Sequence, residues 1–204
     1  MEQRDAIMLT ITDLADVIAD ARSLSPDERK QLHRELRHHH KQGRITAAGA
    51  KDERGTALFD EAEACRASLL TILSEGGLKG EGLERANRCM SQAADARLQL
   101  PAMNGSFPPV GLDAAIDGVK KGEKGQNWSL RVQVMWDCRE QSREQLSLGG
   151  FERADQPPYP ESDPRSRSSV WRDRDILHGF ELVVRCEDHF PAVIRAFAEL
   201  DSAE

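Results

Sequence analysis

The sequence predicts a mixed α+β protein, with helices in its N-terminal half and strands in its C-terminal half. Three observations support this fold class: two helix-capping patterns near the N-terminus, two later segments in which apolar and polar residues alternate, and a stretch between them rich in proline and glycine. We therefore expect a helical domain at 9–98, a linker at 99–127 and a small α+β domain at 128–204, where antiparallel strands precede a terminal helix.

The capping patterns define the first two helices. In each, a hydroxyl residue, Thr10 or Ser25, is followed three positions later by a carboxylate, so that the two side chains can satisfy backbone N–H groups left unpaired at a helix start. A proline directly after Ser25 suits the first helical position. These signals predict a short helix at about 11–22 and a longer one at about 26–42, which ends at a glycine.

Apolar spacing and glycine stops predict the rest of the N-terminal half. A third helix is expected at about 60–75, ended by two glycines, and a fourth at 81–98. Between the second and third helices, the apolar segments 44–46 and 57–59 flank a polar stretch that contains glycine. This pattern favours a small β-hairpin.

Strict alternation of side chains predicts two strands in the C-terminal half, at 128–138 and 176–186. Residues 139–168 contain four prolines and are expected to form a long loop. The linker holds one short helical turn at 112–119. A terminal helix follows the second strand, because apolar residues recur there at helical spacing: Phe190, Val193, Ile194, Phe197 and Leu200.

Charge is distributed unevenly along the chain. The whole protein carries a formal charge of −7, from 28 Lys and Arg against 35 Asp and Glu. Residues 29–51, however, contain seven Lys and Arg and one acid, Glu35, together with four histidines. So concentrated a positive charge is self-repulsive unless it meets an anion, which indicates phosphate contact. A solvated helix face is the alternative interpretation.

Other classes of function find no support in the sequence. No apolar run approaches the ~20 residues of a membrane span, and the N-terminus lacks a secretory signal pattern, so we expect a cytoplasmic protein without a membrane partner. The four cysteines are widely spaced, and His38, His39 and His40 point in different directions on a helix, so no metal site is expected. Without a nucleophile elbow, a phosphate-binding loop or a zinc-protease motif, we expect neither catalysis nor a cofactor.

Four segments within residues 9–90 resemble motifs of the MerR-type family of transcriptional regulators. Ile11-Thr12-Asp13-Leu14-Ala15 is similar to its opening I-x-E-L-A, and the ten residues from Leu36 to Ile45 resemble its L-R-Y-Y-E-x-x-G-L-I. The segment from Gly55 to Glu61 is similar to its G-Y-R-R-Y-S-E, and the residues from Leu70 to Leu78 to its L-x-x-L-x-x-x-G-F/L. About seven extra residues precede the second motif, and Ala57 and Leu58 stand where the family has paired wing arginines.

The resemblance implies a winged helix-turn-helix regulator that binds double-stranded DNA sequence-specifically, with RNA polymerase as a further partner and an unidentified effector. We also expect a homodimer, because one short helix in a groove makes too few contacts for useful specificity. The candidate DNA-binding residues are the basic side chains and one histidine of the second helix, and basic residues of the wing: Arg29, Lys30, Arg34, Arg37, His38, Lys41, Arg44, Lys51 and Arg54. We expect the helix to contribute more than the wing, since the wing arginines are replaced.

Two other functions remain open at this point. The protein could be a DNA-packaging adaptor of the terminase small-subunit type, or an interaction module whose basic helix meets an acidic protein. The C-terminal aromatic residues could form an effector pocket, or a core and dimer surface around Phe190 and Phe197.

Overall fold

The computed structural model describes residues 8–49, 53–98, 111–122, 127–137, 144–153 and 176–201. Within these ranges the protein is a mixed α+β structure, as the sequence predicts. The helices are α1 (Ile11–Ala21), α2 (Pro26–Lys41), α3 (Glu61–Glu75), α4 (Gly80–Leu98), α5 (Leu112–Lys121) and α7 (Cys186–Asp201). The strands are β1 (Leu9–Thr10), β2 (Leu58–Phe59), β3 (Trp128–Asp137), β4 (Glu144–Arg153) and β5 (Ile176–Arg185).

Both expected capping boxes are present, and they fix the starts of α1 and α2. The Thr10 hydroxyl accepts from the Asp13 N–H at 3.3 Å, and the Asp13 carboxylate accepts from the Thr10 N–H at 3.3 Å. Ser25 and Glu28 form the same reciprocal pair at 3.4 and 2.8 Å. Local sequence signals therefore place the turn between α1 and α2 at residues 22–25.

The expected hairpin is corrected by the structure. Leu58 and Phe59 pair with Thr10 and Leu9 in a two-stranded antiparallel sheet, rather than with 44–46. One backbone hydrogen bond, from Ala48 N–H to the Leu58 carbonyl at 2.9 Å, joins the start of the intervening loop to β2. Phe59 is fully buried and its partner Leu9 is 7% exposed, so this small sheet lies against the core at the start of α1.

Residues 139–168 were expected to form a long loop, but residues 144–153 of this segment form strand β4. The larger sheet is antiparallel, with the order β4-β3-β5. Leu130 of β3 lies opposite Phe151 of β4, and both are fully buried. Gly149 and Gly150 interrupt the alternation of apolar and polar side chains along β4, which is why the sequence did not predict this strand. In the sheet they pair in register with Val132 and Arg131 of β3.

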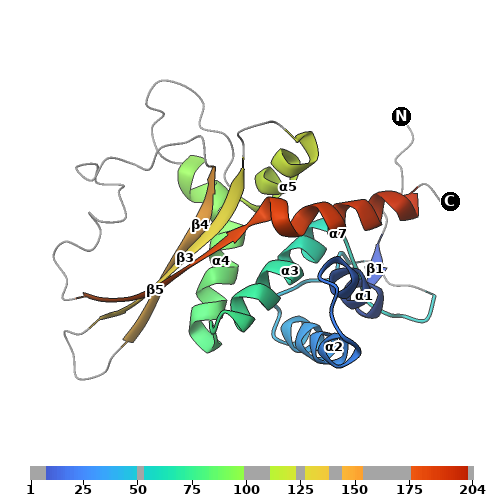
Figure 1. The fold of residues 1–204 in the computed structure, drawn as a ribbon, viewed down its shortest axis with the longest axis horizontal. Coiled ribbons are helices and arrows are strands. Elements are labelled where there is room, and N and C mark those ends of the chain that lie inside the picture. Colours follow the sequence, from blue (N-terminus) through green and yellow to red (C-terminus); the bar gives the residue numbers. More distant parts are fainter. Residues whose placement is uncertain are drawn as a thin grey trace.

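Helix α3 lies at the centre of the molecule, between the sheet and the α1–α2 pair (Figure 1). It contacts α2, α4, α5, α7 and β5, and eight of its residues are buried. Its apolar residues point in almost all directions, as in a helix surrounded by protein. The buried cluster extends from Leu9 to Phe197, so both expected domains contribute to one core.

Helix α7 packs on α1, α3 and α5, and it covers one side of this core (Figure 1). Phe190 is fully buried and Phe197 is 5% exposed within the single chain. Both rings therefore belong to the chain's own core, and a dimer interface around them stays a prediction. None of the described helices is long and apolar enough to cross a membrane.

Candidate nucleic-acid interface on helix α2

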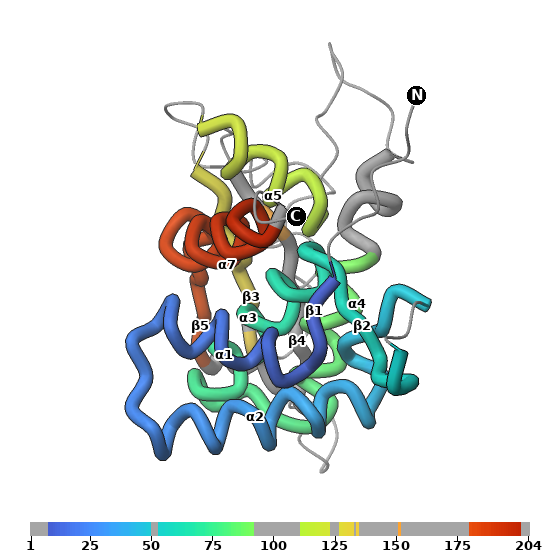
Figure 2. The backbone as a smooth tube through the Cα atoms, turned by 90° about the vertical axis from the view of Figure 1, so that its right-hand side faces the viewer, coloured from blue at the N-terminus to red at the C-terminus, as the bar shows by residue number. Residues whose placement is uncertain are grey.

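Helix α2 lies along one edge of the molecule, with α1 beside it (Figure 2). Its buried side chains are Leu32, Leu36 and His39, which are spaced by four and three residues and so form one stripe. This stripe faces α1 and α3. The opposite face of α2 is therefore the one that meets solvent.

Four cations occupy that outer face: Lys30, Arg34, Arg37 and Lys41. Their spacing of four, three and four residues keeps them within roughly 60° of one another around the helix, and the stripe is roughly 16 Å long. All four side chains are exposed. In the described part of the chain, no hydrogen bond or ion pair engages the side chains of Arg34, Arg37 and Lys41. We call these four residues the α2 cationic face.

Lys30 is the member of this face that has an acidic partner. Its ammonium lies 3.1 Å from the Asp27 carboxylate, and both side chains are largely exposed to water. Exposed pairs of this kind contribute little stability and separate easily when a stronger anion approaches. Lys30 therefore remains available to a phosphate.

Arg29 has a different role from the one expected. Its guanidinium donates to Asp16 at 2.9 Å and to Asp20 of the same helix α1. The hydrogen bond from Arg29 is the main reason that the pKa of Asp16 is lowered, and His33 lies 3.4 Å from the same carboxylate. Arg29 thus joins α2 to α1, and we remove it from the candidate interface.

Arg44 is also removed from the interface, because it is only 8% exposed. Its Nε donates to Glu84 of α4 at 2.6 Å, and its Nη1 donates to Nδ1 of His39 at 3.3 Å. These contacts tie the segment after α2 to α4. Glu84 lies forty residues along the chain, so no local pattern in the sequence indicated the pair.

The remaining expected residues have distinct positions. His38 is exposed and its ring lies 6.3 Å from that of His39. Arg54 is exposed in the loop before β2 and interacts with another group of the protein. Lys51 lies outside the described residues. A shallow depression lies alongside the cationic face and is lined by Arg29, Lys30, His33, Arg34 and Arg37.

The three consecutive histidines lie in three environments. His38 is exposed, His39 is buried against Arg44, and the His40 ring packs edge-on against Phe59 with centroids 5.1 Å apart. Among the described residues, no group of His, Cys, Asp and Glu is arranged to hold a metal ion. Burial of His39 was readable in the sequence, since it continues the spacing of Leu32 and Leu36.

Two of the four cysteines are buried structural thiols. Cys65 and Cys186 have no accessible surface, and burial raises the pKa of each thiol well above its ordinary range. Neither thiol is positioned to react with a dissolved oxidant or metal ion. Both residues pack in the core.

In comparisons with known proteins, no family model, no curated protein and no solved structure matches this chain.

Proposed function

We propose that this protein is a DNA-binding transcriptional regulator that contacts double-stranded DNA through the α2 cationic face. The observation that carries the proposal is the placement of four exposed cations on the side of α2 opposite its buried stripe, three of them without an ion-pair partner among the described residues. A helix in a major groove needs this arrangement, with one face held by the protein and the other presented to phosphates and base edges.

Charge supports the choice of an anionic partner. The protein has a formal charge of −7, yet this face gathers four cations, and one acid, Asp27, lies beside them. Lys41 also stabilises the C-terminal end of the helix dipole, and this effect alone would explain a cation there. It does not explain Arg34, which lies near the middle of the helix. Phosphate contact accounts for both positions.

The helix pair fits the resemblance to MerR-type regulators in several respects. A capped α1, a four-residue turn and a capped, cationic α2 follow one another as in a helix-turn-helix, and Arg29 fixes the second helix on the first. In this proposal a homodimer places two copies of α2 in successive major grooves, because one short helix makes too few contacts for useful specificity. An effector and RNA polymerase are further partners that the family resemblance suggests.

The test is selection of genomic DNA fragments by the purified full chain, followed by sequencing and footprinting. We expect enriched fragments that share a palindrome with half-sites about one helical turn apart. DNA binding by a ring-sized oligomer without a palindrome would favour a packaging adaptor. Absence of DNA affinity at low salt would refute the proposal and favour a protein-interaction module.

A further inference from the structure

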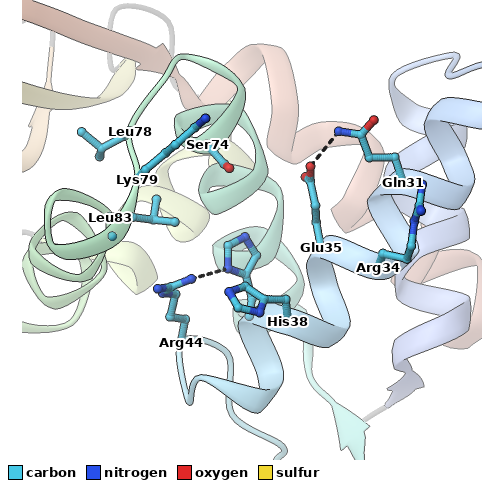
Figure 3. A pocket seen from close by; sticks show the side chains of 11 residues that line it. Gln31, Arg34, Glu35, His38, Arg44, Ser74, Leu78, Lys79 and Leu83 are labelled. Carbon is cyan, nitrogen blue, oxygen red and sulfur yellow. Dashed lines mark hydrogen bonds between the residues drawn. The ribbon is translucent and has the colours of Figure 1, made fainter.

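A second site lies on the other side of α2 from its helical partner α1, where the helix faces the turn between α3 and α4. A cavity of about 400 Å³ opens there, within the size range of small-molecule sites. Figure 3 shows side chains from α2, including Gln31, Arg34 and Glu35, facing Ser74, Leu78 and Leu83 across this space. None of these residues belongs to the proposed DNA interface except Arg34.

One of the residues that line the cavity, His39, carries an unpaired hydrogen-bond donor. His39 is 2% exposed, and its Nδ1 accepts a hydrogen bond from Arg44 Nη1 at 3.3 Å (Figure 3, dashed line). Because a guanidinium only donates, Nδ1 carries no proton and Nε2 must carry one. Nε2 has no partner in the described structure. A buried N–H without an acceptor is costly, so an acceptor atom of a bound molecule that reaches Nε2 would be stabilised there.

The charges around the cavity favour an anion. Arg34, Arg44 and Lys79 line it against one carboxylate, Glu35, and that carboxylate accepts a hydrogen bond from Gln31 at 2.9 Å. The charge of Arg44 is shared with Glu84. Arg34 and Lys79 therefore leave the lining with a net positive charge.

The rest of the lining is apolar. Leu78 is fully buried and Leu83 is 3% exposed, and both contribute to the wall beside Lys79. A free phosphate or sulfate would leave this part of the cavity without a matching group. A molecule with a hydrocarbon body and one anionic end would fill both parts.

We propose that this cavity binds a small organic carboxylate. The carboxylate accepts a hydrogen bond from His39 Nε2 and pairs with Lys79 and Arg34, while the hydrocarbon body packs on Leu78 and Leu83. The inference is tested without DNA, and it shares one residue, Arg34, with the α2 cationic face.

The experiment titrates the full chain with benzoate, and with benzyl alcohol as a neutral molecule of similar shape. Binding is measured by calorimetry, and the His39 imidazole nitrogens are followed by NMR. We expect benzoate to bind and to shift the Nε2 resonance of His39, and benzyl alcohol to bind more weakly. Equal affinity for the alcohol, absence of benzoate binding at millimolar concentration, or binding that leaves the His39 resonance unchanged would each overturn the proposal.

Two variants and one control locate the site. Lys79→Gln alters an exposed side chain and should weaken benzoate binding about two- to fivefold. Lys121→Gln, the matched control at the exposed end of α5, should leave it unchanged. His39→Phe removes the buried donor and should weaken binding roughly two- to tenfold. Should His39→Phe fail to fold, the Lys79 and Lys121 variants still decide, and equal effects in these two would refute the location.

Discussion

Replacing Arg37 by alanine is the sharpest test of the α2 cationic face. Its side chain is exposed, and none of the described residues forms an ion pair with it, so its removal should leave the fold unchanged. We expect DNA affinity to fall by about 1–3 kcal/mol if Arg37 makes a close phosphate or bidentate base contact. Arg34→Ala should have an effect of similar size.

The dependence on salt gives a second, independent magnitude. Counting all seven basic residues of 29–51 predicts a log–log slope of binding against salt of about −6, from about 0.9 counterion released per phosphate contact. The structure leaves four exposed cations on the face, which lowers the expected slope to about −3.6 per subunit. If Arg37 contacts a phosphate, its alanine variant should lose about one unit of slope.

Fluorescence anisotropy with a labelled DNA duplex at several salt concentrations measures both quantities, with circular dichroism to check folding. Lys121→Ala serves as the control for a general change of charge, because it removes an exposed cation from α5. Arg54→Ala reports on the loop before β2, and we expect it to have a smaller effect than the α2 variants. If Arg54→Ala abolishes binding while Arg34→Ala and Arg37→Ala bind normally, the loop recognises DNA and the assignment to α2 is wrong.

Three further predictions concern the packing around these sites, and urea unfolding measures each. Arg44→Ala should destabilise the fold by about 1–3 kcal/mol, because it leaves Glu84 and the buried His39 imidazole without their donor. Lys30→Ala breaks an exposed ion pair and should cost no more than about 0.5 kcal/mol. Equal losses of stability in the two variants would contradict this difference. Burial, followed by the charge of Arg44, lowers the pKa of His39 to about 4 from an unfolded value of about 6.5. The unfolded chain therefore takes up a proton first as the pH falls, and the free energy of unfolding should drop by about 3 kcal/mol between pH 6.5 and pH 4. His39→Gln should flatten this pH dependence, and an unchanged pH profile in the variant would disprove the role of His39. Alanine normally stabilises a helix relative to glycine, but Gly118→Ala should destabilise the fold by about 1–3 kcal/mol, because the new Cβ would lie 2.1 Å from the indole nitrogen of Trp128. A gain in stability would show that the Trp128 ring moves aside freely.

Local patterns in the sequence were sufficient for most helices and two of the long strands. The capping boxes at Thr10 and Ser25 fixed the starts of α1 and α2, since their hydrogen bonds join residues three apart. Alternation identified β3 and β5. In β3 the alternate residues Leu130, Val132 and Val134 are buried, whereas in β5 Val184 is buried and Phe180 is 40% exposed. Strand β4 shows no such pattern because two adjacent glycines interrupt its alternation, and only pairing with β3 establishes it.

The sequence alone also indicated where positive charge gathers, but not which charges reach solvent. Arg29 and Arg44 look equivalent to Arg34 and Arg37 in the sequence, yet the first two are held by carboxylates of α1 and α4. Capping and periodicity depend on neighbours within a few residues, whereas ion pairing and burial depend on elements that only folding brings together. For that reason the basic helix was determined by the sequence, while its four-residue outer face and the cavity beside His39 were decided by the tertiary structure.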